Sequence, residues 1–381
     1  MPDMEKRISL AAKTNTCYVF NVGDNDGWAV TTANGGDSRV LAFSCEGRLN
    51  PDKQPDQLKA LLTIYDGIAG RCNAGRPSTS SAQQEAIAPM LTTKWSEQAP
   101  YNSLCPLVAG EDGQTKVHAA AGSAAVAVAQ LMRYYKWPAA LDGIEHTSWH
   151  LADYSFPDYG KLPDIMPDWD VMADQYDSDE EELSGEVARL MQYVGYGLRS
   201  YYRWQSTSVI WTDICNFLDK YGYDTQTEGI NPFLDIDRPV SDDAIYEEVS
   251  AGRPVIILMR LIDEVQNHVA VVDGYSYMPE SSCGYYHVNW GWGGEGNGYY
   301  YLPTDITSNE EMSSYFYTMQ MIAVHKVNND KLKDTNPTNI DGAQCISSTN
   351  ASDWYDLQGR RLNGQPRHGL YIRDGRKYVA R

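Results

Sequence analysis

Near its start the chain alternates apolar and polar residues in short runs. These runs predict three strands, over 16–22, 27–34 and 38–44. Behind them, apolar residues recur at helical spacing and predict a helix over 55–70, carried by Leu58, Leu61, Leu62, Tyr65 and Ile68. Small and polar residues over 73–85 indicate an exposed linker. The pattern therefore predicts a small α+β unit over residues 1 to about 85.

From about residue 87 the pattern predicts helices first and strands later. Three helices are expected, over 123–136, about 180–198 and about 206–221. Four strand-like runs follow, over 254–260, 268–275, 283–292 and 298–303. This order is typical of the α+β class. A polar stretch over 328–342 indicates a second linker, and three short strands with Gly turns are expected in the tail.

Composition narrows the range of partners. The 381 residues include 51 acidic and 31 basic side chains, which gives a net charge of −20. That charge repels nucleic acid and anionic membrane surfaces, so neither is expected as a partner. No apolar run is long enough to predict a membrane span. Residues 1–14 lack the apolar core of a signal peptide, so either the protein is cytosolic or an export signal has been removed.

The sequence contains no strong motif for binding a metal or a cofactor. The seven cysteines are scattered without a CxxC pair, which argues against a zinc site and a dense disulfide framework, although one isolated bridge stays open. Residues 291–296 fit the G-x-G-x-x-G pattern, but strand-like residues follow where a dinucleotide site needs a helix. We expect these glycines to shape a loop that passes close to another group, and we expect no cofactor or metal.

Four residues are candidates for catalysis. Ser123 follows Gly122 at the start of an alanine-rich helix, where a serine is usually an N-cap. A helix N-terminus can also stabilise a nucleophile and, through a backbone N–H, an oxyanion. His268 opens an alternating strand and could supply the base, while Asn289 or Trp290 on the next strand could orient or shield its ring. We interpret His287 as structural.

Several segments resemble the streptopain family of bacterial cysteine peptidases. Residues 122–132 read G-S-A-A-V-A-V-A-Q-L-M, with K-W-P at 136–138, and resemble the segment around the family's nucleophile. Residues 268–275 read H-V-A-V-V-D-G-Y and are similar to its histidine segment. The signature H-V-N-W-G-W-G-G occupies 287–294, and K-W-S-E-Q-A-P-Y-N at 94–102 resembles the start of a mature enzyme.

The resemblance implies a fold and a domain order. It implies a papain-like two-lobe catalytic domain, with a helical lobe and an antiparallel β lobe, over 94–328. Residues 1–85, with a linker to about 93, are similar to the family's inhibitory prodomain. Residues 329–381 resemble, more weakly, the small C-terminal β modules of secreted bacterial proteins. Ser123 and His268 would then form the catalytic pair, with Asn289 or Trp290 positioning the histidine.

Ser123 departs from the family, which has cysteine at this position. A serine hydroxyl is far less acidic than a thiol and cannot rest as an ion pair with histidine, so the site should be nearly inactive. The resemblance then implies the precursor of a secreted or cell-surface cysteine endopeptidase, acting on protein or peptide substrates and inhibited by its own prodomain. Either the serine was introduced to trap this precursor, or the chain is a natural pseudopeptidase that binds peptides without cleaving them. A weaker alternative is an adhesin whose function lies in the C-terminal module.

Overall fold

The computed structural model describes most of the chain between residues 8 and 326, together with four strands near the C-terminus. The described residues are 8–14, 16–33, 39–50, 62, 65, 84–151, 154–231, 236–238, 240–261, 267–279, 283–302, 317–326, 354–355, 361–362, 369–373 and 376–380. They divide into two units, one over 1–221 and 225–325 and one over 222–224 and 326–381.

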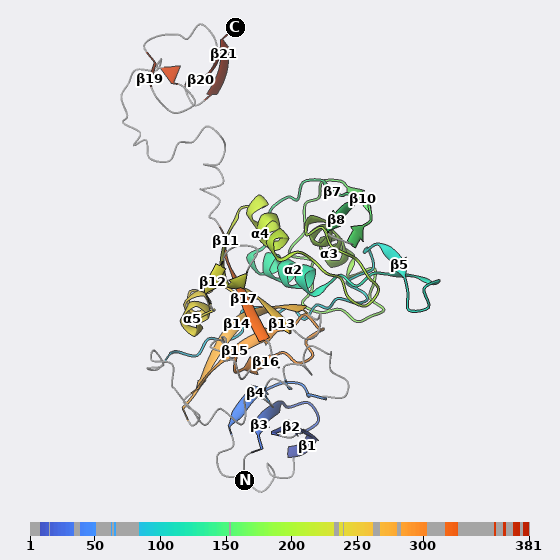
Figure 1. The fold of residues 1–381 in the computed structure, drawn as a ribbon, viewed down its shortest axis with the longest axis vertical. Coiled ribbons are helices and arrows are strands. Elements are labelled where there is room, and N and C mark those ends of the chain that lie inside the picture. The colour runs from blue at the N-terminus through green and yellow to red at the C-terminus, as the bar shows by residue number, and fades with distance from the viewer. Residues whose placement is uncertain are drawn as a thin grey trace. The chain divides into compact units, whose positions relative to one another are not determined.

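An eleven-stranded sheet organises the first unit (Figure 1). Its strand order is β1-β2-β3-β4-β16-β15-β14-β13-β17-β11-β12. The strands are β1 (Ile8–Lys13), β2 (Cys17–Val22), β3 (Trp28–Thr32), β4 (Val40–Ser44), β11 (Tyr223–Asn231), β12 (Ile236–Arg238), β13 (Val255–Leu261), β14 (Asn267–Met278), β15 (Cys283–Asn289), β16 (Gly298–Tyr300) and β17 (Tyr317–Lys326). The seven strand predictions for this unit are confirmed within a few residues.

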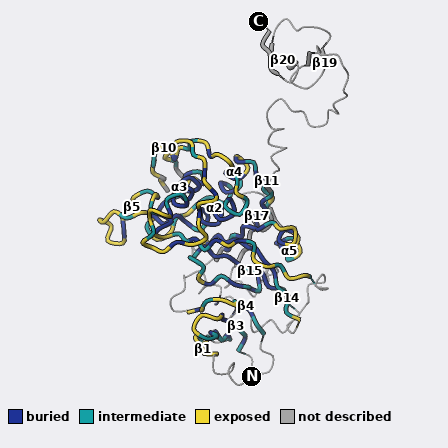
Figure 2. The backbone as a smooth tube through the Cα atoms, turned by 180° about the vertical axis from the view of Figure 1, so that it is seen from behind, coloured by how far each residue is buried: buried dark blue, intermediate teal, exposed yellow. Residues whose placement is uncertain are grey.

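The sheet is most deeply buried along β14 (Figure 2). Eight consecutive residues of this strand, His268–Tyr275, are buried, whereas β2 and β3 alternate between buried and half-buried residues. A continuous buried run indicates a strand that is covered on both faces. Helix α2 (Ser123–Tyr135) and helix α5 (Asp242–Ser250) both pack against β14.

The helical lobe consists of α2, α3 (Gly185–Gly197) and α4 (Trp211–Lys220). Every residue of α2 from Ala124 to Met132 is buried, since its small side chains let it lie between the sheet and α3. The predicted starts of α3 and α4 were about five residues too early. The acidic run before α3 forms turns instead, with Ser184 as the N-cap residue.

Other elements were not predicted at all. They are β1, α5, β17, β11 and β12, and the paired short strands β5 (Leu107–Ala109), β6 (Lys116–His118), β7 (Ile144–His146), β8 (Trp149–Leu151), β9 (Tyr154–Phe156) and β10 (Gly160–Leu162). Strands of three residues are too short for a periodic pattern. Of the predicted helix over 55–70 the structure describes Leu62 and Tyr65, both helical and buried. Nearly all of the linker at 73–85, and the whole of that at 328–342, lie outside the described residues.

The second unit contains a four-stranded antiparallel sheet. Its order is β19-β18-β20-β21, with β18 (Trp354–Tyr355), β19 (Arg361–Leu362), β20 (Gly369–Arg373) and β21 (Arg376–Ala380). The prediction of three strands was one too few. The predicted α+β class is confirmed, because helices and antiparallel strands occupy separate parts of the first unit.

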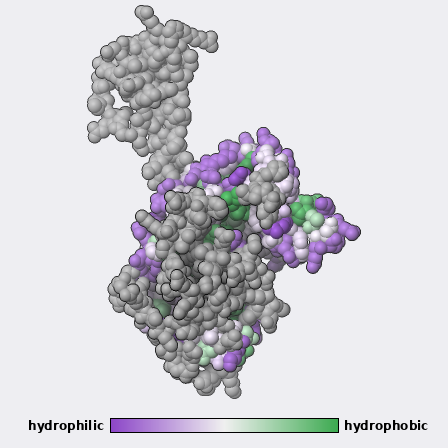
Figure 3. Space-filling model, in the orientation of Figure 1, coloured by the Kyte–Doolittle hydropathy of each residue, from purple (hydrophilic) through white to green (hydrophobic). Residues whose placement is uncertain are grey.

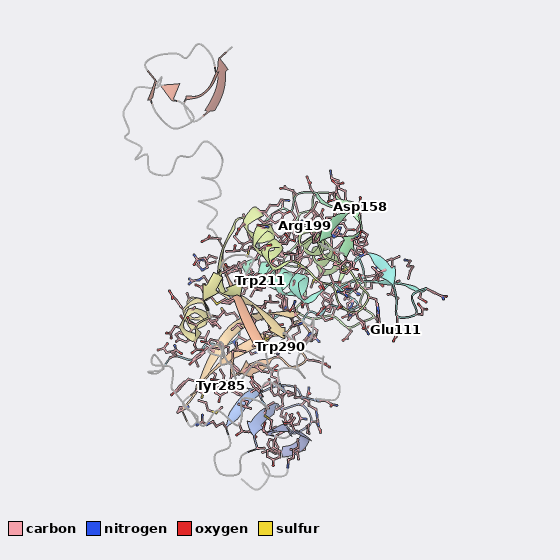
Figure 4. The ribbon with its side chains drawn as sticks, in the orientation of Figure 1. Glu111, Asp158, Arg199, Trp211, Tyr285 and Trp290 are labelled. Atoms are coloured by element: carbon pink, nitrogen blue, oxygen red, sulfur yellow. The ribbon has the colours of Figure 1, made fainter. Side chains whose placement is uncertain are left out.

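The N-terminal strands extend the main sheet through β4, which pairs with β16. Tyr299 lies opposite Phe43, and the two rings stack at 5.1 Å. The hydroxyl of Tyr285 donates to the carbonyl of Val40 at 2.8 Å. Figure 4 labels Tyr285 at the side of the sheet nearer these strands. The N-terminal strands β1 to β4 are therefore joined to the remainder of the sheet by backbone pairing as well as by side chains.

We expect Gly298→Ala to loosen this pairing. A Cβ at Gly298 would lie 2.7 Å from the carbonyl oxygen of Phe43 and 2.9 Å from the ring of Trp28. Overpacking of this kind costs about 1–3 kcal/mol. Amide exchange over 40–44 should therefore quicken by about 5–150-fold. The control is Gly185→Ala, where a Cβ meets nothing within 4 Å; equal exchange in the two variants would contradict the expectation.

Candidate active site

Ser123 is the first residue of α2, not its N-cap as the residue pattern suggested. The N-cap is Gly122, whose φ of 91° places it in the region that favours glycine. A Cβ at Gly122 would also lie 3.0 Å from the side chain of Thr207. Because Gly122 turns the chain into the helix, the hydroxyl of Ser123 is left for tertiary contacts.

The hydroxyl of Ser123 lies against β14. It accepts a hydrogen bond from the backbone N–H of Val269 at 3.3 Å. His268 is the preceding residue on the same strand, so the structure brings the two predicted catalytic residues to adjoining positions of one helix and one strand.

The ring of His268 is buried and oriented by a backbone carbonyl. Its Nε2 lies 2.9 Å from the carbonyl oxygen of Trp290. A carbonyl can only accept, so Nε2 carries the proton and Nδ1 is the basic nitrogen. Burial lowers the pKa of His268 to about 4, and the Trp290 carbonyl opposes that shift.

Two tryptophans pack beside this ring. The ring centroids of Trp290 and Trp292 lie 5.9 Å and 4.7 Å from that of His268, and the two indoles stack at 5.0 Å. Trp290 is labelled near the middle of the first unit in Figure 4. Of the two predicted orienting residues, Trp290 makes the hydrogen bond to His268, and it does so through its backbone.

The side chain of Asn289 hydrogen-bonds to three other segments around the site. Its Oδ1 accepts from the N–H of Gly291 at 3.1 Å and from Nε2 of Gln130 at 3.2 Å. Its Nδ2 donates to the carbonyl of Thr93 at 2.8 Å. Asn289 thus ties α2 to the strand that carries Trp290. The residue pattern gave no sign of the role of Gln130.

The glycine-rich segment 291–296 is a loop, and β16 follows it. Gly291, Gly293, Gly294 and Gly296 all have positive φ. A Cβ at Gly291 would lie 2.9 Å from Val126 of α2, and the N–H of Gly293 donates to the carbonyl of Trp95 at 3.1 Å. The predicted close approach is confirmed, and the segment that follows the loop is a strand, as expected.

Glu97 is a site residue that the sequence did not reveal. Its carbonyl accepts from the N–H of Ala121 at 2.8 Å, which aligns it with the residues that enter α2. The side chain of Glu97 is half-buried. Burial raises the pKa of this carboxyl to about 7, and the Ser123 N–H opposes that shift. The one hint in the sequence was an acidic residue inside the segment 94–102, which resembles the start of a mature enzyme.

A cavity of about 360 Å³ lies beside the residues that follow Glu97 in the sequence. It is lined by Gln98, Ala99, Pro100, Asn102, Ser103, Val117, His118, Ser178 and Glu181. Hydrophobic colour also shows on the β5–β6 hairpin in Figure 3, where Leu107 is exposed. The cavity lining mixes polar and apolar side chains.

His287 has the structural role predicted for it. Its Nδ1 lies 2.6 Å from Oδ1 of the buried Asp273, whose Oδ2 accepts from the N–H of Leu91 at 2.7 Å. Among the described cysteines, Cys45, Cys105 and Cys215 are thiols that form no disulfide. Across the described ranges, no group of three His, Cys, Asp or Glu residues could hold a metal ion. Nor does any described helix have the length and apolarity to cross a membrane.

Comparisons with known sequences agree with this geometry. The sequence profile of the Peptidase C10 family matches residues 95–300, and that of the Spi protease inhibitor matches residues 3–68. The chain is 26% identical over 306 residues to the thiol protease/hemagglutinin PrtT of Porphyromonas gingivalis, covering 75% of this chain and 33% of that protein. It is 23% identical over 302 residues to streptopain of Streptococcus pyogenes, covering 75% of this chain and 73% of that protein. The chain thus spans about a third of the length of PrtT and about three quarters of that of streptopain.

A solved structure shows the same fold. A fragment of prointerpain A from Prevotella intermedia, determined as a cysteine-to-alanine mutant, matches with a TM-score of 0.60 at 24% identity. The match covers 84% of this chain and 98% of that fragment. The predicted papain-like catalytic fold with an N-terminal prodomain is confirmed.

Proposed function

Because the chain belongs to the Peptidase C10 family, a family of cysteine peptidases, and carries an inhibitor-like prodomain, we propose that it is a precursor whose site binds peptides but barely hydrolyses them. The observation that carries this proposal is the hydroxyl of Ser123. It stands where the nucleophile would stand, one strand position from the base His268.

In the parent chemistry a thiolate at 123 attacks the peptide carbonyl carbon. Imidazolium at 268 gives its proton to the leaving amine, and water then hydrolyses the thioester. With Ser123 the nucleophile must first lose a proton that it holds far more tightly than a thiol does. His268, with a pKa near 4, is a weak acceptor for that proton. The expected result is peptide binding with very slow acyl transfer.

The same proposal assigns roles to the other segments of the chain. Residues 1–85 act as the prodomain, 94–328 as the peptidase domain and 329–381 as a C-terminal module, with processing between 71 and 93. Pairing of β4 with β16 supports inhibition in cis. We assign protein or peptide substrates and a secreted or surface location.

The test labels the nucleophile position. Ser123→Cys, freed of residues 1–93 by limited proteolysis, should form an adduct with a peptidyl vinyl sulfone at residue 123. Burial raises the pKa of Cys105 to about 12 and that of Cys215 to about 11, so these thiols should stay unlabelled. The unchanged chain should bind a fluorescent peptide and leave it intact.

Ser123→Cys combined with His268→Ala should label much more slowly than Ser123→Cys alone. If a folded Ser123→Cys chain formed no adduct at residue 123, that residue would not be the nucleophile position. The proposed function would then be wrong.

A further inference from the structure

Gln130 is a polar residue inside the buried helix α2. Every other residue from Ala124 to Met132 is apolar, and the Gln130 side chain is 1% exposed. Burying an amide is costly unless its polar atoms find partners, so this position favours an apolar residue unless the amide makes specific hydrogen bonds. Gln130 follows Ser123 by seven residues, which is about two helical turns, so both residues lie on the same face of α2.

The amide of Gln130 makes hydrogen bonds to two segments outside the helix. Its Oε1 accepts from the hydroxyl of Thr93 at 2.9 Å and from the N–H of Trp95 at 3.4 Å. Its Nε2 donates to Oδ1 of Asn289 at 3.2 Å. A backbone N–H can only donate, so the contact with Trp95 fixes Oε1 on that side and leaves Nε2 facing Asn289.

Asn289 holds one end of the peptide group that joins Trp290 to Gly291. Its Oδ1 accepts from the N–H of Gly291 at 3.1 Å. The carbonyl oxygen of the same peptide group lies 2.9 Å from Nε2 of His268. Because a trans peptide group is planar, with its N–H and C=O pointing in opposite directions, holding the N–H also fixes the direction of the carbonyl.

The direction of this carbonyl decides which nitrogen of His268 carries the proton. With the Trp290 carbonyl in place, Nε2 is the donor and Nδ1 is left as the base. A rotated peptide group would take this acceptor away from the buried Nε2–H, and the tautomer protonated at Nδ1 would then become competitive.

We propose that Gln130 is a positioning residue for His268. Through Asn289 and the peptide group between Trp290 and Gly291, its amide holds the imidazole in the tautomer whose Nδ1 is basic. The catalytic consequence of this inference rests on the proposed function, whereas the tautomer itself can be measured without any catalysis.

A role of Gln130 in packing alone predicts a different outcome. It would require only that the space be filled, so methionine, which is close to glutamine in size and flexibility, would serve as well. The positioning role requires the Nε2 donor, which methionine lacks.

The first test reads the tautomer by NMR of the full chain with nitrogen-15 in its histidines, with His268→Gln to identify the signals of His268. The parent chain should show a protonated Nε2. In Gln130→Met this proton should exchange with solvent about tenfold faster, as expected when one hydrogen bond is weakened, and signals of the Nδ1–H tautomer should appear.

Val128→Ala is the matched control. Val128 is a fully buried residue of the same helix, and its truncation removes packing but no hydrogen bond. The His268 signals of this variant should equal those of the parent chain. Parent-like exchange and a parent-like tautomer in folded Gln130→Met would overturn the proposal. If Gln130→Met does not fold, Gln130→Glu takes its place, because an ionised glutamate keeps the size of the side chain but has no donor for Asn289.

A double-mutant cycle tests the order of the contacts. Asn289→Leu removes the next residue of the path and should change the His268 signals as Gln130→Met does. The double variant should add nothing to the effect of either change, because both act through one peptide group. Effects that sum in the double variant would show that the two residues act separately, and the proposal would be wrong.

The catalytic consequence is tested in Ser123→Cys chains that are cut within the linker 73–85, so that Thr93 stays in place. Adding Gln130→Met should lower kcat on a fluorogenic peptide by about 10–100-fold, because a misplaced base slows the reaction. KM should change little, because Gln130 is buried away from the substrate. Adding Val128→Ala should leave kcat unchanged.

Labelling by the vinyl sulfone separates a failure of this inference from a failure of the proposed function. If the thiol at residue 123 is labelled at the same rate with and without Gln130→Met, and kcat is also the same, the assignment of Gln130 is wrong while the proposed function stands. If a folded Ser123→Cys chain is not labelled there, the proposed function fails, and the tautomer in the full chain still decides the role of Gln130.

Discussion

Replacing Glu97 by glutamine is expected to stabilise the folded chain at pH 8 and to leave its stability at pH 4 nearly unchanged. The carboxyl pKa is raised from its ordinary 4.5 to about 7 on folding. Between these values the folded chain holds a proton that the unfolded chain releases, so stability falls as pH rises. A shift of this size corresponds to on the order of 3 kcal/mol. Glutamine removes this loss.

Urea unfolding at the two pH values checks this expectation. Glu97→Gln should raise the midpoint at pH 8 relative to the parent chain, with an unchanged slope. Glu111→Gln removes the same charge from an exposed site and should have no such pH-dependent effect. A gain for Glu97→Gln that is equal at pH 4 and pH 8 would show that the carboxyl group does not titrate as described.

Replacing His268 by glutamine is expected to remove a large contribution to the change of stability between pH 7 and pH 4. Burial lowers the pKa of this imidazole from 6.5 to about 4, so the unfolded chain takes up a proton that the folded chain refuses. Stability from this group is present above pH 6.5 and is lost as pH falls toward 4, by on the order of 3 kcal/mol.

The readout is the difference in unfolding free energy between pH 7 and pH 4. Glutamine keeps a donor for the Trp290 carbonyl, and any packing cost is the same at both pH values and cancels. His118→Gln, on the exposed strand β6, should show the same difference between the two pH values as the parent chain. A parent-like difference in His268→Gln would contradict the buried neutral ring.

The sequence predicted the parts of the site that lie in continuous patterns. Helix α2 and strands β13 to β15 were found because long apolar runs fix both their type and their place. The choice between Asn289 and Trp290 could not be made, because the contact to His268 comes from a backbone carbonyl that has no residue signature. The N-cap prediction for Ser123 was wrong because the φ of Gly122 decides where α2 begins.

Glu97 was missed for a different reason. Its place in the site depends on a backbone hydrogen bond from Ala121, 24 residues further along the chain, and no local periodicity reports such a contact. The starts of α3 and α4 were misplaced because acidic and polar side chains satisfy turn amides as readily as helical ones. The short hairpins, including the one bearing Glu111, have strands too brief to alternate.

Glu97 and His268 also act on protonation in opposite senses. At about pH 5.5 the unfolded chain would have the acid mostly ionised and the histidine mostly protonated, while the folded chain has both groups mostly neutral. Each state then binds the same number of protons, so folding takes up and releases no net proton through these two groups. The two pH dependences largely cancel between about 4.5 and 6.5 in the parent chain. They become visible only when one of the two residues is replaced. At mildly acidic pH, a peptide that enters the site meets an acid and a base that are both uncharged.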